Sequence, residues 1–259
     1  MKSLVKYLKI FYPSLAVMIL LLIVWQTYTE ISSIRQSILP PPSLVISSLF
    51  EFREIILTHT VQTVAETIIG FVLAIIIGSA IAILIFYSGL LRRAFYPLLT
   101  ISQTIPIIAL APLFVLWLGF GILPKVILVA VFCLFPIAVA TSDGLLNTPK
   151  HLSEYMQTIG AGRLQTLRYL NIPYALDRFF SGLKIGAVYA VTAAVIGEYV
   201  GAFKGLGVYL QTSASSHATA LVFAATLVII TLSLALLGLV FFVQSRVMPW
   251  RRSDESKNQ

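Results

Sequence analysis

Few side chains in this sequence could carry catalytic chemistry, and their spacing predicts none. Cys133 is the single cysteine, and no histidine lies in its own or adjacent helical turns. A thiol nucleophile needs a base within hydrogen-bonding reach, and His59, His151 and His217 lie far from it and from one another in the sequence. The chain has no CxxC or HExxH metal spacing and no Gly-Lys-Ser/Thr phosphate loop. We therefore expect no enzyme, no ATP hydrolysis, and no metal or cofactor held by this chain.

Two carboxylates, Glu66 and Glu198, lie near the outer ends of apolar stretches. An acidic side chain in a membrane span is costly and is a functional candidate by default. Gln62 and Thr63 precede Glu66 by one turn, and Tyr199 follows Glu198. Each carboxylate could therefore contact a solute. The favoured alternative is structural: a hydrogen-bonded interfacial carboxylate for Glu198 and an interfacial polar cluster for Glu66.

The composition around these residues is that of a membrane protein. Of the 259 residues, 58% are hydrophobic and only 11% are charged, which predicts an all-α polytopic membrane protein. Six stretches reach the roughly 20 residues needed to cross a bilayer. They are 12–28, 61–87, 95–118, 122–142, 179–200 and 219–243. The first has no small-x-small cleavage site after it, so we interpret it as a retained span.

The basic residues indicate the orientation of these spans. With both termini in the cytoplasm, only Arg35, Arg53, Lys125 and Lys204 of the 18 basic residues fall on the outer side. The formal net charge of +8 follows from this bias and requires no nucleic-acid partner.

Residues 154–173 form a polar segment between the fourth and fifth predicted spans. Apolar residues recur at helical spacing on both sides of Gly160-Ala161-Gly162, and Pro173 is expected to end the segment. Glycine lets the backbone reverse between two short helices. The predicted orientation places this projection in the cytoplasm, where a partner could dock on it. The alternative is an amphipathic loop lying on the bilayer surface.

The spacing of this segment resembles the EAA loop of bacterial ABC-importer permeases: Glu-Ala-Ala, three residues, Gly, nine residues, Ile-x-Leu-Pro. The match runs without a gap, although Tyr155 and Met156 replace the two alanines, Leu170 replaces the isoleucine and Ile172 replaces the leucine. The resemblance implies that the loop couples the permease to an ATPase. The residues expected to do so are Glu154, Gly160, Ala161, Gly162, Leu170, Ile172 and Pro173.

Residues 105–121 and Phe135-Pro136 resemble the nitrate/taurine/sulfonate branch of that family. Pro106 and Pro112 interrupt a predicted span, which is tolerated where the freed carbonyls face protein or a water-filled path. We expect Gln103, Thr104 and Pro106 to line a substrate pathway, together with Tyr199 and the two carboxylates. A kinked packing helix is the alternative.

Two other segments bear on packing. Pro40-Pro41-Pro42 resembles an outer element of the same branch, and Ser43 is expected to be the N-cap of a short helix over 44–56, although a plain linker is the alternative. Small residues of the fifth span, such as Gly182 and Gly186, predict close helix approach in a dimer seam or a tight bundle.

The resemblance implies an N-terminal span with an outer linker over 1–58, a type-1 ABC permease domain over 59–246, and a cytoplasmic tail over 247–259. It implies a complex in a bacterial cell membrane that contains a second permease copy as a homodimer. Two separate ATPase subunits would hold ATP and Mg²⁺, and an extracytoplasmic solute-binding protein would deliver the substrate. The permease would work by alternating access.

The substrate is expected to be a small organic solute. Residues 194–207 and Phe223-Ala224-Ala225 most resemble the members that carry pyrimidine-type thiamine precursors, with aliphatic sulfonate, taurine or nitrate as the alternative. A passive channel would need no docking loop. An intramembrane enzyme would need a nucleophile–base pair or a metal constellation.

Overall fold

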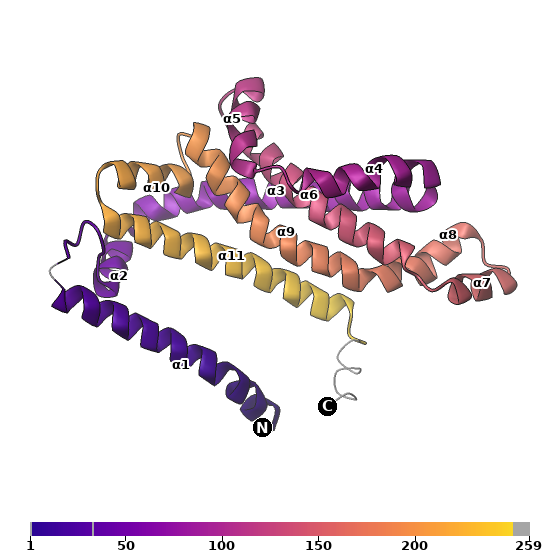
Figure 1. The fold of residues 1–259 in the computed structure, drawn as a ribbon, viewed down its shortest axis with the longest axis horizontal. Coiled ribbons are helices and arrows are strands. Elements are labelled where there is room, and N and C mark those ends of the chain that lie inside the picture. The colour runs from indigo at the N-terminus through magenta and orange to yellow at the C-terminus, as the bar shows by residue number, and fades with distance from the viewer. Residues whose placement is uncertain (1, 33, 251–259) are drawn as a thin grey trace. The chain divides into compact units, whose positions relative to one another are not determined.

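The computed structural model describes residues 2–32 and 34–250, and the elements it contains there are all helical (Figure 1). This confirms the all-α class for the described residues. Most of the predicted tail, residues 251–259, lies outside them. The elements are α1 (Lys2–Ile31), α2 (Pro42–Glu51), α3 (Arg53–Tyr87), α4 (Gly89–Ser102), α5 (Ile107–Leu118), α6 (Leu123–Leu146), α7 (Lys150–Thr158), α8 (Arg163–Thr166), the π-helical η1 (Leu167–Asn171), α9 (Ile172–Gly201), α10 (Leu206–Ser215) and α11 (Thr219–Val247).

Within residues 2–32 and 34–250, five helical segments are long and apolar enough to cross a membrane. They are Tyr12–Ile31, Arg53–Tyr87, Leu123–Leu146, Arg163–Gly201 and Thr219–Val247. A sixth crossing exists if α4 and α5, which meet at a bend of 104°, form one broken span. The predicted third span over 95–118 thus corresponds to two helices, with an interruption at Pro106 as expected.

The break between α4 and α5 comes from Pro106. Proline lacks the N–H of a helical ladder and disfavours helical backbone at the residue before it. The chain turns after Ser102, with the Thr104 N–H donating to the Ile101 carbonyl at 2.9 Å, and Pro106 becomes the N-cap of α5. The second proline, Pro112, lies inside α5 without interrupting it.

Two predicted helix boundaries are also wrong, both because proline is well tolerated in the first turn of a helix. Helix α2 begins at Pro42 with Pro41 as its N-cap, so Ser43 is not a cap, and the helix ends at Glu51 instead of residue 56. Pro173 does not end the polar segment, because it lies in the first turn of α9, which begins at Ile172.

The chain divides into two compact units. The first comprises the chain up to Thr58 together with Tyr209–Val228. Within it, the rings of Trp25 and Phe223 lie 5.4 Å apart, and the Ser43 N–H donates to Gln26 Oε1 at 3.1 Å.

The second unit comprises His59–Val208 and the chain from Ile229 onward. Its centre is the pair α6 and α9, which pack along much of their length (Figure 1). Close approach depends on glycine: a Cβ on Gly182 would lie 2.9 Å from the Pro136 carbonyl oxygen. Cys133 is fully buried and its Sγ donates to the Gly186 carbonyl at 3.2 Å, so it is a packing residue. The small residues of α9 thus build a tight bundle within this unit.

Candidate functional site

Glu66 and Glu198 meet in the interior of the second unit, with only 0% and 1% of their surfaces exposed. Thr63 Oγ1 donates to Glu198 Oε1 at 2.6 Å, and the Gly207 N–H donates to Glu198 Oε2 at 2.7 Å. Gln62 Nε2 donates to Glu66 Oε1 at 2.8 Å. These bonds join α3, α9 and the start of α10 through one group of side chains, which we call the carboxylate cluster.

Lys125 supplies the positive charge of the carboxylate cluster, and the sequence analysis missed it. It lies in the first turn of α6, is only 3% exposed, and interacts electrostatically with both carboxyl groups. Its ammonium group also donates to the Gly121 carbonyl oxygen. A lysine at the start of an apolar span was the available signal, but the charge pattern alone assigned it to the outer surface.

The two carboxyl groups are buried together and interact electrostatically. Two ionised carboxylates close together in a dry interior repel each other. Glu66 Oε2 has no donor among the described residues. Lys125 supplies the positive charge that can offset this repulsion.

The carboxylate cluster also holds the turn between α9 and α10. The Leu206 N–H donates to Thr63 Oγ1 at 2.9 Å, and the Gly205 N–H donates to His59 Nδ1 at 3.0 Å. Gly205 has a φ of +132°, and a Cβ there would collide with the Glu198 carboxyl group. The turn therefore requires glycine both for its backbone and for the approach of the carboxylate.

A projecting loop, residues 150–171, forms the second candidate region. Helices α7 and α8 project at one end of the α6–α9 pair (Figure 1). Gly160 adopts a φ of +79° between them, its N–H donates to the Gln157 carbonyl at 2.9 Å, and the Gly162 N–H donates to Gln165 Oε1 at 2.8 Å. The predicted reversal at glycine is thus present.

The projecting loop exposes most of the residues expected to couple it to a partner. Glu154, Gly160, Gly162, Ile172 and Pro173 are exposed, and Ala161 and Leu170 are half-buried. Large apolar side chains join this exposed face: Tyr155, Ile159, Leu164 and Tyr169 are all more than 60% exposed.

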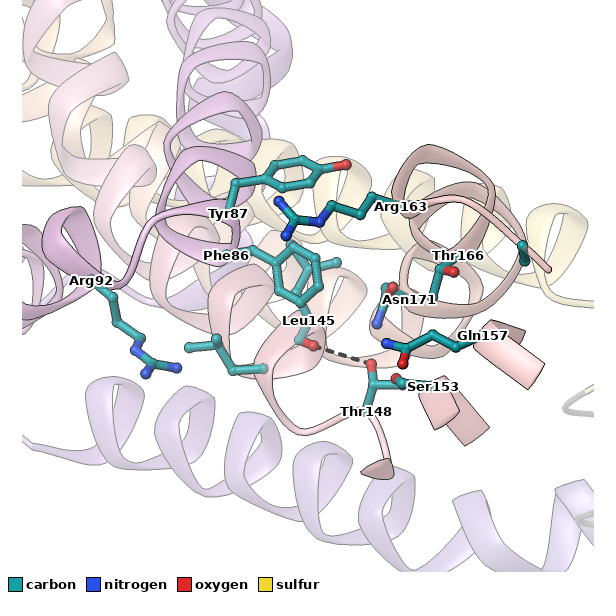
Figure 2. A pocket seen from close by; sticks show the side chains of 12 residues that line it. Phe86, Tyr87, Arg92, Leu145, Thr148, Ser153, Gln157, Arg163, Thr166 and Asn171 are labelled. Atoms are coloured by element: carbon teal, nitrogen blue, oxygen red, sulfur yellow. Dashed lines mark hydrogen bonds between the residues drawn. The ribbon is translucent and has the colours of Figure 1, made fainter. Parts of the chain in front are cut away.

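A cavity of about 490 Å³ separates the projecting loop from the ends of α3 and α6 (Figure 2). Figure 2 shows Gln157, Thr166 and Asn171 directed toward one another on the loop side, while Phe86 and Arg92 come from the side of the membrane helices. Leu167 provides the apolar anchor, because it packs in a buried cluster with Ala82, Leu145 and Ala175. The loop is therefore held at its base and free along its length.

The remaining pathway candidates lie apart from the carboxylate cluster. Gln103, Thr104 and Pro106 are exposed at the break between α4 and α5, and Tyr199 is 47% exposed. No hydrogen bond among the described residues connects the break to Glu66 or Glu198. Residues 2–32 and 34–250, so far as their side chains are described, contain no group of three His, Cys, Asp or Glu that could hold a metal ion.

Membrane-length helices carrying a projecting two-helix loop define a polytopic membrane protein. The family described as "Binding-protein-dependent transport system inner membrane component" matches residues 70–249. The chain belongs to this family, whose members are the permease subunits of ABC transporters and are not themselves catalytic. The family works with an ATPase and a binding protein.

Several relatives are similar over most of the chain. A probable ABC transporter permease of Haemophilus influenzae is 37% identical over 83% of this chain and 88% of its own length. The formylaminopyrimidine transport permease ThiX of Halalkalibacterium halodurans is 34% identical over 91% of this chain and 94% of its own. The taurine transport permease TauC of Escherichia coli is 28% identical over 92% and 89%.

Solved structures share the fold. A chain of the inward-facing MetNI methionine ABC transporter superposes with a TM-score of 0.63 at 22% identity, over 77% of this chain and 97% of the other.

Proposed function

We propose that this chain forms the membrane pathway of an ATP-driven importer for a pyrimidine-type thiamine precursor. The similarity to ThiX over nearly the whole of both chains is the observation that supports this choice of substrate. A riboflavin transport permease, RibX of Chloroflexus aurantiacus, is also 34% identical. Two relatives are therefore named for the transport of planar nitrogen heterocycles. The taurine relative is less similar over an equal share of the chain, which makes a sulfonate the second candidate.

The projecting loop supports the coupling part of this proposal. Its exposed apolar side chains suit burial against a partner protein, and its base is anchored by Leu167 to the spans. In the proposed complex two permease copies, as a homodimer, use this loop to bind two ATPase subunits, which hold ATP and Mg²⁺. An extracytoplasmic binding protein delivers the solute on the other side.

The permease domain is proposed to span residues 59–246, with the first span and outer helix before it and a cytoplasmic tail after it. The break at Gln103–Pro106 and Tyr199 are proposed to line the pathway. Glu66 and Glu198 are proposed to hold the outer ends of the spans together, since burial and hydrogen bonding leave them no surface for a solute in this conformation.

Uptake by the reconstituted complex tests the substrate. The permease, its ATPase and its binding protein are placed in proteoliposomes with labelled formylaminopyrimidine or labelled taurine. ATP-dependent accumulation of the pyrimidine, and little accumulation of taurine, is expected. Accumulation of taurine alone would contradict the proposed substrate.

Cysteine labelling tests the orientation on which docking depends. Ser43→Cys and Gln165→Cys are introduced separately in a Cys133→Ala background, and both positions are exposed. A membrane-impermeant thiol reagent should label Ser43→Cys in intact cells and Gln165→Cys only after the cells are opened. Labelling of Gln165→Cys from outside would place the projecting loop on the wrong side and remove the coupling role.

A further inference from the structure

A recess of about 210 Å³ lies beside the break between α4 and α5. Gln103 at the end of α4 faces it together with residues of α5, α6 and α9. The lining residues are Gln103, Ile107, Phe132, Phe135, Pro136, Tyr189 and Thr192. We call this feature the break recess.

The break recess lies at the middle of the membrane-spanning helices. Phe132 and Phe135 are near the midpoint of α6, which runs from Leu123 to Leu146. Substrate sites in membrane transporters typically lie near the midplane, where discontinuous helices meet. The break recess therefore lies at the depth at which a transport subsite is expected.

The break recess combines apolar side chains with a few polar groups. Pro106 caps α5 without any side-chain hydrogen bond, and the Ala109 N–H donates to the Pro106 carbonyl at 3.0 Å, so only the first two N–H groups of that helix have no helical partner. Unpaired backbone groups at membrane depth are tolerated only against protein or a water-filled cavity. Among the described residues, the side-chain amide of Gln103 and the hydroxyl of Tyr189 also make no hydrogen bond. These polar groups are therefore available to a ligand in the break recess.

The chemistry of the lining selects for a neutral, flat ligand. The rings of Phe132, Phe135 and Tyr189 offer π faces on which a heteroaromatic ring can stack. The Gln103 amide offers a donor and an acceptor together, which matches the alternating donors and acceptors of an aminopyrimidine edge. No charged side chain lines the recess in the described part of the chain. A sulfonate or nitrate ion would find no counter-charge there and would lose its hydration at a high cost.

Size narrows the class further. Pockets for drug-sized ligands are typically about 300–1,000 Å³, and the break recess is smaller. A single substituted ring suits it better than a three-ring flavin. We propose that the break recess is a transport subsite for a single-ring aminopyrimidine, with Phe135 stacking on the ring and Gln103 bonding its edge. This inference rests on the proposed import of such a compound.

Uptake of labelled formylaminopyrimidine by the reconstituted complex tests the subsite. Phe135→Leu keeps an apolar side chain but removes the ring, and Gln103→Leu removes the amide. The initial uptake rate per assembled complex should fall about tenfold for Phe135→Leu and about fivefold for Gln103→Leu. Co-purification of the ATPase gives the amount of assembled complex, so a folding defect is separated from lost recognition.

Phe95→Leu is the matched control. Phe95 lies on α4, is 49% exposed and does not line the break recess. Its variant should import the pyrimidine within about twofold of the wild-type rate.

These uptake measurements distinguish failure of the proposed subsite from failure of the proposed substrate. Wild-type uptake of the pyrimidine with unchanged rates for both Phe135→Leu and Gln103→Leu would overturn the subsite and leave the proposed function intact. Uptake of taurine alone by the wild-type complex would overturn the proposed substrate and the subsite together.

Discussion

The carboxylate cluster and the projecting loop are built in opposite ways. In the carboxylate cluster, buried polar side chains from different helices bond one another, and Glu66 and Glu198 have almost no exposed surface. In the projecting loop, hydrogen bonds are local, such as Gly160 N–H to the Gln157 carbonyl, and apolar side chains face outward. The first arrangement makes its own helices depend on one another, whereas the second leaves its surface available for another protein.

The largest effect on stability is expected when the carboxylate cluster loses Glu198. Glu198→Leu leaves Thr63 and the Gly207 N–H without their acceptor and removes a negative charge near Lys125. Breaking a buried charged group of this kind typically costs about 3–5 kcal/mol. The thermal unfolding temperature of the purified complex and its yield should both fall sharply.

Glu198→Gln is the matched control, because the amide keeps one acceptor oxygen for Thr63 and nearly the same shape. It should retain most of the assembled complex. An equal loss with Leu and with Gln would show that the charge of Glu198, and not its hydrogen bonds, holds the helices.

Removal of the lysine should have a smaller effect. Lys125→Met removes the ammonium group but leaves a pair that can take up a proton, so a cost of about 2 kcal/mol in unfolding free energy is expected. Lys204→Met, at an exposed position, should change little.

A double-mutant cycle sharpens this prediction. If Lys125 offsets the negative charge of the carboxyl pair, Glu66→Gln should restore part of the stability that Lys125→Met loses, with a coupling energy of about 1–3 kcal/mol. If the two substitutions change the free energy of unfolding additively, Lys125 is not energetically coupled to the carboxyl pair.

The smallest effect on stability, with a large effect on transport, is expected in the projecting loop. Gly160→Leu forces a side chain into a positive φ, which costs about 1–3 kcal/mol locally and can be relieved by reshaping the turn. The protein should insert normally, while uptake and ATPase co-purification fall together.

Gly89 provides a control outside the projecting loop, since its φ is not positive and a Cβ there would meet nothing within 4 Å. Gly89→Ala should transport at close to the wild-type rate. Transport by Gly160→Leu at the wild-type rate would show that the turn at Gly160 is not needed for coupling to the ATPase.

Local features of this protein were predictable from the sequence, because local rules produce them. The glycine reversal at Gly160 depends on backbone freedom at one residue, and the interruption at Pro106 depends on a missing N–H. The same rules led to an error at Ser43: a favourable cap residue was overridden by Pro42, so that the helix starts two positions earlier than predicted.

Features that depend on tertiary packing were not predictable in the same way. Glu66 and Glu198 were both expected near the outer ends of their spans, which is compatible with a pair but does not require one. Lys125 joins them only because α3, α6 and α9 pack together, and the charge pattern indicated only that it lies on the outer side of the membrane. The break recess likewise combines side chains of four helices, so no single stretch of the sequence predicts it.

The absence of a loop between η1 and α9 has a mechanical consequence. From Arg163 to Gly201 the chain is helical without interruption over 39 residues. Figure 1 shows that α8 and α9 run in different directions, so together they form a bent element. The second arm of the projecting loop thus belongs to the same continuous helical segment that carries Glu198. The π-helical turn at Leu167–Asn171 sets the orientation of that arm, because each residue inserted or removed there would turn it by about 100° about the helix axis.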